Sequence, residues 1–140
     1  MKKIWNLLLV AALLLASPCQ AQLMRTLSDV HKLKEQEANF INKPLKKLLK
    51  EIGPKIRMAS GQTNRPDNHA SYIIFKFVDA EVYLKHEKGK VYTSIIVFIK
   101  ENYDWDSTRK TKSENYHWTK EDEKKYGNLT VVGIQVFGDN

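Results

Sequence analysis

Tyr72-Ile73-Ile74-Phe75-Lys76-Phe77-Val78 is the stretch of sequence that decides the fold of this 140-residue chain. Its residue types are those that favour β-structure, and apolar side chains recur at every second position. This alternation predicts a strand with Ile73, Phe75 and Phe77 on a buried face and Lys76 on the other. Such a strand needs neighbours in a sheet and a second layer over its apolar face, and the flanking sequence supplies both.

An amphipathic helix precedes this strand. Its apolar residues recur at helical spacing, at i, i+3, i+4 and i+7: Leu45, Leu48, Leu49 and Ile52. The opposite side carries Lys46, Lys47 and Lys50, so the apolar side is expected to pack on the sheet. Gly53-Pro54 predicts the end of the helix, with the glycine in the left-handed conformation that often terminates helices.

Further elements follow from periodicity and capping signals. The expected elements are a helix over 23–36 with Leu27, Val30 and Leu33 on one side, strands over 55–59, 91–100 and 129–137, a short helix capped by Asp79, and a helix opened by a Thr119/Asp122 capping box and ended by Gly127. Helices come first and strands afterwards. This order predicts an α+β fold, with N-terminal helices packed on a twisted antiparallel sheet of four to five strands. The layout resembles that of cystatin-like domains, by analogy only, because no shared motif accompanies it and no function follows.

The N-terminus has the composition of a secretory signal peptide. Lys2 and Lys3 precede an apolar run too short to span a bilayer, and small residues at Cys19 and Ala21 predict cleavage before Gln22. We therefore expect residues 1–21 to be removed and residues 22–140 to form a single domain, exported to a bacterial periplasm or to the medium. The weaker alternative is a lipoprotein, anchored to the membrane through Cys19.

Composition limits the chemistry of the expected mature chain. Cys19 is the single cysteine, so removal of the leader excludes disulfides, thiolate metal sites and a cysteine nucleophile. The leader also removes two lysines, which lowers the formal net charge from +7 to +5. The remaining lysines are spread along the chain, as in a soluble surface. Because an exported protein does not meet nucleic acid in its working compartment, we expect no nucleic-acid partner.

The strongest candidate site is aromatic. The motifs Tyr103-Asp104-Trp105 and Tyr116-His117-Trp118 place an aromatic residue on each side of a polar one, and polar residues 107–113 separate them. A hairpin through that polar stretch would put all four rings on one side of the sheet, with Asp104 and His117 as hydrogen-bonding groups between them. Such rings bind proteins or glycans. The competing interpretation is that at least one Tyr-Trp pair belongs to the hydrophobic core.

The leading functional hypothesis is therefore a non-enzymatic binding module, an inhibitor or accessory protein. A second hypothesis is a small envelope hydrolase or ligand-binding enzyme with His69 or His117 as general base. A third is a lipid-anchored structural protein of the envelope. No residues are assigned to a catalytic or metal site: the histidines show no metal-ligand spacing, and the run Asn102, Asp104, Asp106 lacks the glycine and the glutamate that complete a calcium loop. No cofactor fingerprint is present.

Overall fold

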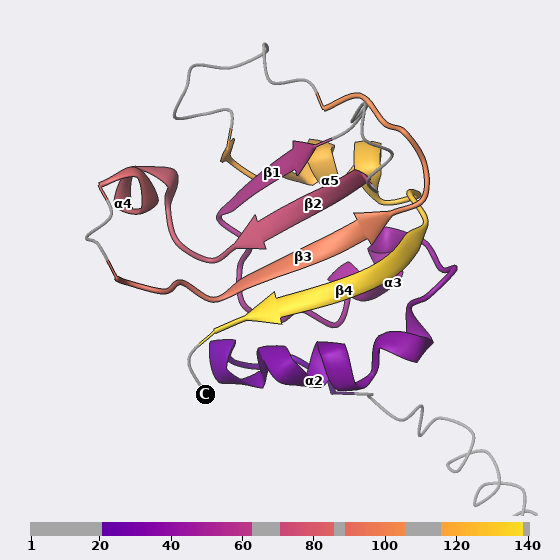
Figure 1. The fold of residues 1–140 in the computed structure, drawn as a ribbon, viewed down its shortest axis with the longest axis horizontal. Helices are drawn as coiled ribbons and strands as arrows, with labels where there is room; N and C mark the ends of the chain where they lie inside the picture. The colour runs from indigo at the N-terminus through magenta and orange to yellow at the C-terminus, as the bar shows by residue number, and fades with distance from the viewer. Residues whose placement is uncertain (1–20, 63–70, 86–88, 106–115, 139–140) are drawn as a thin grey trace, which may run out of the picture.

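The computed structural model describes residues 21–62, 71–85, 89–105 and 116–138. Four strands form one antiparallel sheet in the order β1-β2-β3-β4: β1 (Met58–Gln62), β2 (Ser71–Lys76), β3 (Ser94–Ile99) and β4 (Val131–Phe137) (Figure 1). Each strand pairs with the next one along the chain. The predicted α+β fold with an antiparallel sheet is confirmed.

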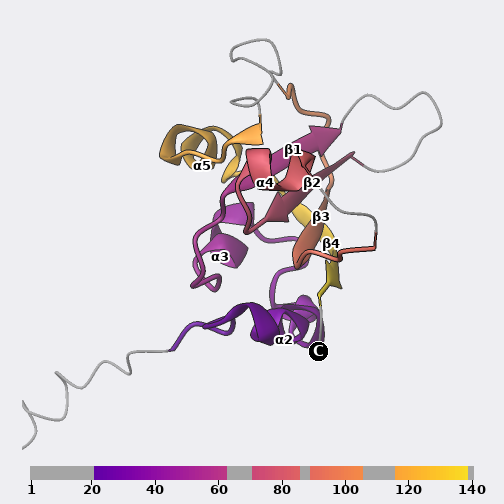
Figure 2. The same cartoon turned by 90° about the vertical axis from the view of Figure 1, so that its left-hand side faces the viewer.

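The helices are short and lie mainly on one side of the sheet. They are η1 (Leu27–Asp29), α2 (Val30–Glu35), η2 (Glu37–Asn39), α3 (Leu45–Leu49), α4 (Ala80–Leu84) and α5 (Lys120–Tyr126). α3 and α5 cover one face of the sheet, whereas α2 runs beside β4 (Figures 1 and 2). No described helix covers the other face, which we call the outer face (Figure 2). In the described part of the chain, no helix is long and apolar enough to cross a membrane.

The core lies between the sheet and α3. All four apolar residues predicted for the amphipathic helix are buried: Leu45, Leu48, Leu49 and Ile52. They face the inner side of the sheet, where Phe75 stands opposite Ala59 on one neighbour and Ile95 on the other, all buried. The predicted burial of Ile73 and Phe75 is confirmed, with Lys76 half-buried on the outer face. Close packing of such apolar rows supplies most of the stability of a small domain.

Two details of the first helices differ from the prediction. The α-helical part begins at Val30, and Leu27 is exposed because it lies in the preceding 3-10 turn. Gly53 does not adopt the left-handed conformation; among the described non-glycine residues, Asn42 has a positive φ, at 60°. Gly53 is needed for a close approach instead: its N–H donates to the Met24 carbonyl over 2.7 Å, and a Cβ would lie 2.8 Å from that oxygen.

The free edge of β4 is closed by the N-terminal half of the chain. The Ile134 N–H donates to Glu37 Oε1 over 2.7 Å. Next to it, the Asn42 N–H donates to the Val131 carbonyl over 2.8 Å, and the Val131 N–H donates to the Lys43 carbonyl over 3.0 Å. Residues 37–43 therefore satisfy three backbone groups of this edge, which hinders its pairing with another chain.

Candidate functional site

A stack of aromatic rings fills the space between α5 and β1. Tyr126, at the end of α5, lies between Trp105 and Trp118: its ring is 5.1 Å from the first and 6.3 Å from the second, nearly parallel to both. Trp118 also packs edge-on against Phe75, with centroids 5.0 Å apart. The Tyr126 hydroxyl donates to the Asp104 carbonyl over 3.0 Å. These contacts hold the segments around residues 105 and 118 against the same helix.

Tyr103 lies beneath this stack, in the core. Its ring meets the edge of the Tyr126 ring, and its hydroxyl donates to the Tyr72 carbonyl and receives a backbone hydrogen bond from Gln62. Burial raises the pKa of the Tyr103 hydroxyl well above its usual range. The ring is 8% exposed, so Tyr103 supports the site from below and presents almost no surface to a ligand.

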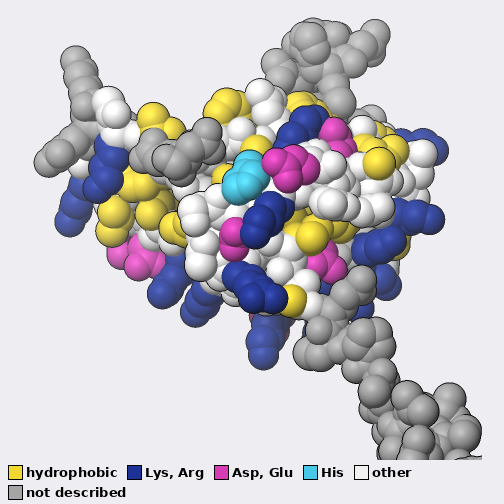
Figure 3. All heavy atoms as spheres, turned by 90° about the horizontal axis from the view of Figure 1, so that it is seen from below, with side chains coloured by type: hydrophobic (Ala, Val, Ile, Leu, Met, Phe, Trp, Pro, Cys, Tyr) yellow, Lys and Arg dark blue, Asp and Glu magenta, His cyan; other side chains and the backbone are white. Residues whose placement is uncertain are grey.

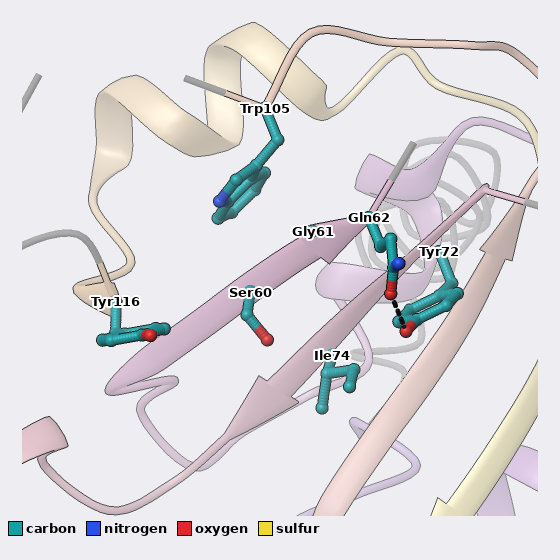
Figure 4. Close-up of a pocket in the computed structure, with 7 residues that line it drawn as sticks. All are labelled: Ser60, Gly61, Gln62, Tyr72, Ile74, Trp105 and Tyr116. Carbon is teal, nitrogen blue, oxygen red and sulfur yellow. Dashed lines mark hydrogen bonds between the residues drawn. The ribbon is translucent and has the colours of Figure 1, made fainter. Parts of the chain in front are cut away.

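A groove of about 560 Å³ runs along β1, and we call it the edge groove. It is lined by Ser60, Gly61, Gln62, Tyr72, Ile74, Trp105 and Tyr116 (Figure 4). Trp105 and Tyr116 lie on the side of β1 that faces away from β2. The polar groups of Ser60, Gln62 and Tyr72 lie across the strand from them, and the Tyr72 hydroxyl donates to Gln62 Oε1. None of the described residues that line the groove carries a charge, so together they offer flat aromatic surface and neutral hydrogen-bonding groups.

Gly61 allows Trp105 to reach the strand. A Cβ at residue 61 would lie 2.6 Å from two ring carbons of Trp105 and 2.6 Å from the Tyr103 hydroxyl. A glycine at this position therefore lets the indole lie directly on the backbone of β1. The position of Trp105 in the groove therefore depends on the absence of a side chain at Gly61.

The structure separates the predicted site residues into two groups. Trp105 and Tyr116 both line the edge groove, whereas Tyr103 is buried in the core and Trp118 packs against Tyr126 and the core. Trp105 also packs against Tyr126 and the core. Three of the four predicted rings thus contact the hydrophobic core, as the competing interpretation expects of at least one Tyr-Trp pair. The side chain of Asp104 is exposed, and its carbonyl serves as an acceptor for Tyr126.

The predicted hairpin between the two aromatic motifs is not the pairing that the described residues show. His117 forms a bridge with Met58, and the Trp118 N–H donates to the Arg57 carbonyl over 3.4 Å. Residues 103–105 belong to no strand. The second motif therefore pairs with the start of β1 rather than with the first motif. The expected turn at residues 107–113 lies outside the described residues.

His117 lines a second, smaller pocket of about 220 Å³. Its walls include Asp79, Arg57, Lys55 and Thr119. Asp79 is paired with Arg57, whose Nη1 lies 3.6 Å from its Oδ1, and the Thr119 hydroxyl is bound to Asp122 Oδ2 in the capping box that opens α5. A histidine and a carboxylate thus share one pocket, while the hydroxyl beside them holds a helix terminus. His69 lies outside the described residues.

Metal ligands do not gather in the described part of the chain, where no group of three or more His, Cys, Asp or Glu side chains is placed to hold an ion. Asn102, the first residue of the incomplete calcium-loop pattern, accepts a hydrogen bond from the Ser71 hydroxyl over 3.3 Å. Asp106 lies outside the described residues.

Tyr126 and Gly61 belong to the site but were not predicted from the sequence as site residues. The helix Lys120–Tyr126 is otherwise charged, and Tyr126 is its one aromatic residue. A single aromatic residue in a charged helix is expected on the side of the helix that packs on the core. Gly61 lies just beyond the strand predicted over 55–59, so nothing marked it as a contact point for Trp105. Both residues act through partners far away in sequence.

The chain matches no model of a known protein family, and it matches neither a curated protein nor a solved structure. Its function is therefore argued from the geometry alone.

Proposed function

We propose that this protein is an exported, non-enzymatic binding module, an inhibitor or accessory protein, that recognises a protein or glycan through the edge groove. The observation that carries the proposal is the composition of that groove. Trp105 and Tyr116 flank neutral polar groups in a volume of about 560 Å³, and the lining residues that the structure describes are all uncharged. Aromatic residues dominate interface hot spots because they bury a large surface at a low entropic cost.

The charge distribution supports a neutral ligand. The chain carries a formal net charge of +7, yet the described side chains around the groove are uncharged. On the face seen from below, lysine and arginine side chains are scattered among acidic ones (Figure 3). Scattered charge of this kind favours solubility rather than recognition of an anionic surface.

The rigid support of Trp105 also favours binding. Its indole is fixed by Tyr126 on one side and by Gly61 on the other, so little conformational entropy remains to be lost when a ligand contacts it. The export of the protein is proposed from its leader sequence, in line with the absence of cysteine from residues 22–140.

The test compares Tyr116→Ala with Tyr83→Ala. Tyr116 lines the groove, whereas Tyr83 lies on α4 next to Tyr92 and Lys76, so the two variants remove the same ring at different sites. Binding is measured against a glycan array and against exported proteins of the native host. We expect Tyr116→Ala to weaken binding at least tenfold and Tyr83→Ala to leave it unchanged. Equal binding by both variants, with both folded, would refute the role of the groove.

The His117 pocket favours a second candidate function, a small hydrolase or ligand-binding enzyme with His117 as general base. The specific observation is that His117 and Asp79 line the same pocket. This candidate ranks second because Asp79 already pairs with Arg57 and the Thr119 hydroxyl is held by Asp122. This candidate function predicts that the wild-type protein hydrolyses a model ester or glycoside. His117→Ala is expected to abolish this activity and His31→Ala to retain it. The absence of turnover by the wild-type protein would refute the candidate function.

A further inference from the structure

The two edge strands of the sheet, β1 and β4, differ in the backbone pairing along their outer sides. β4 is closed: α2 packs beside it, Glu37 accepts the Ile134 N–H, and residues 42–43 pair with Val131. On β1, the described residues provide a single bridge along the side away from β2, that between Met58 and His117. The bridge occupies this side at Met58 and its immediate neighbours, and from Ser60 to Gln62 no backbone hydrogen bond joins that side to a described residue.

The backbone of β1 points hydrogen-bonding groups toward this open side. Gln62 directs its N–H to the Tyr103 hydroxyl, which is bound to the Tyr72 carbonyl on β2. Successive residues of an antiparallel strand direct their N–H and C=O groups to opposite sides. Ala59 and Gly61 therefore turn theirs away from β2. The Trp118 N–H already uses the same side one step earlier, where it donates to the Arg57 carbonyl.

The residues of β1 also lack the side chains that usually protect an edge strand from pairing. Soluble proteins shield edge strands with lysine, proline or inward-pointing charges. The sequence of β1, MASGQ, contains none of these. In a chain with 23 lysines and arginines, an uncharged edge flanked by Trp105 and Tyr116 is a surface shaped for pairing with another strand.

We propose that the edge of β1 from Ala59 to Gln62 binds an extended peptide segment of a partner protein, which adds to the sheet as a fifth strand. The peptide exchanges main-chain hydrogen bonds with Gly61 and donates one to the Ala59 carbonyl. Its side chains alternate, and one set packs on Trp105 and Tyr116. Because these rings and the neighbouring polar groups are uncharged, the bound segment is apolar or neutral at those positions. This inference rests on the proposed function and names its ligand class.

The experiment selects nine-residue peptides from a random phage-displayed library against the purified protein. Synthetic versions of the selected peptides are then methylated at one backbone nitrogen at a time. We expect methylation at every second position to weaken binding at least tenfold, with little effect at the positions between. This period of two follows because alternate amides of the peptide face β1. Binding that tolerates methylation throughout overturns strand addition.

A matched pair of lysine variants tests the location. Ser60 and Gln135 stand at opposite ends of one row across the sheet, in which Ser60 pairs with Ile74, Ile74 with Ile96, and Ile96 with Gln135. Ser60→Lys introduces a protecting charge at β1 and is expected to weaken peptide binding at least tenfold. Gln135→Lys adds the same charge at β4 and is expected to leave binding unchanged. Equal losses in the two variants overturn the inference, and the methylation scan decides alone if Ser60→Lys does not fold.

Other occupants give different results. A concentration-dependent dimer that Ser60→Lys abolishes would assign the edge to a second copy of this chain and overturn the peptide proposal. Glycans that bind in a Tyr116-dependent way, without any selected peptide, would overturn the inference while the proposed function stands. The absence of both peptide and glycan binding would overturn both.

Discussion

The indole of Trp105 rests on the backbone of Gly61, with so little space between them that a Cβ at residue 61 would lie 2.6 Å from ring atoms Cδ2 and Cε3. This contact joins a segment that belongs to no strand to the edge strand of the sheet. It fixes one wall of the edge groove, and the Tyr126 ring supports the same indole through a stacked contact.

Gly61→Ala is expected to displace Trp105 from β1, because atoms at such a separation overlap and the ring must move. Overpacking of this kind costs about 1 to 3 kcal/mol in the free energy of unfolding. Urea denaturation measures the loss, and a change in tryptophan emission reports the displaced ring. Ser60→Ala, at the next position of β1, serves as the control, with an expected change within about 0.5 kcal/mol. An alanine variant as stable as the wild type would show that the strand can move away from Trp105 at no cost.

Tyr126 is expected to contribute more to the stability of the domain through its ring than through its hydroxyl. Tyr126→Ala removes the ring between Trp105 and Trp118 and is expected to lower the free energy of unfolding by about 3 to 5 kcal/mol, as for other large buried rings. Tyr126→Phe keeps the ring but loses the hydrogen bond to the Asp104 carbonyl, at a cost of about 1 kcal/mol. Leu84→Ala is the control because Leu84 is 59% exposed. Similar losses for the alanine and phenylalanine variants would contradict the importance of stacking.

Glu37→Ala is expected to open the edge of β4. The carboxylate of Glu37 accepts the Ile134 N–H, so its loss leaves that amide exposed to exchange. Hydrogen exchange measured by NMR should be at least tenfold faster at Ile134 in this variant, and unchanged in Glu35→Ala, whose side chain is exposed. Unchanged exchange at Ile134 would mean that another group protects the edge.

The same carboxylate predicts a dependence on pH. Hydrogen bonds from Lys34 and then from the Ile134 N–H hold the pKa of Glu37 below its usual value of 4.5. A lowered native pKa stabilises the fold above the unfolded pKa, and this contribution is lost as the pH falls through the native pKa. The stability difference between the wild type and Glu37→Gln is therefore expected to shrink in acid. Parallel stability curves between pH 7 and pH 3 would argue against this linkage.

Processing of the N-terminus is predicted to occur before Gln22. Glu51 anchors the residues that follow Gln22. The Leu23 N–H donates to Glu51 Oε2, and the Met24 N–H donates to the Glu51 carbonyl. The Met24 side chain is fully buried. Cleavage before Gln22 would keep these contacts. The intact mass of the protein from the native host should match a chain that starts at Gln22. A mass that starts at an acylated Cys19, and that changes in Cys19→Ala, would instead identify a lipoprotein.

Local signals predicted those parts of the fold that depend on neighbours in sequence. The Thr119/Asp122 capping box is present as expected, because both partners lie within one turn of α5. The buried sides of α3 and β2 were predicted in the same way, because the spacing of apolar residues in each element determines which side chains are buried.

Features that depend on distant partners were not predictable. A bulge shifts the register between Phe98 and Ile99, so that Val131 pairs with Ile99 and Gly133 with Phe98. Val132 is the extra residue, so a bulge interrupts the strand predicted over 129–137. The pairing of His117 with Met58 similarly depends on where the sheet places its edge.

The closure of β4 by Glu37 also affects how the chain folds. The hydrogen bond from Ile134 spans 97 positions of sequence, and the pairing of Val131 with residues 42–43 spans nearly as many. Contacts between segments so far apart form slowly, because the long loop between them must close first. A ribosome that is still adding residues 131–137 therefore holds an N-terminal half that has no β4 to pack against. The contacts that close this edge can form only when synthesis of the described chain is nearly finished.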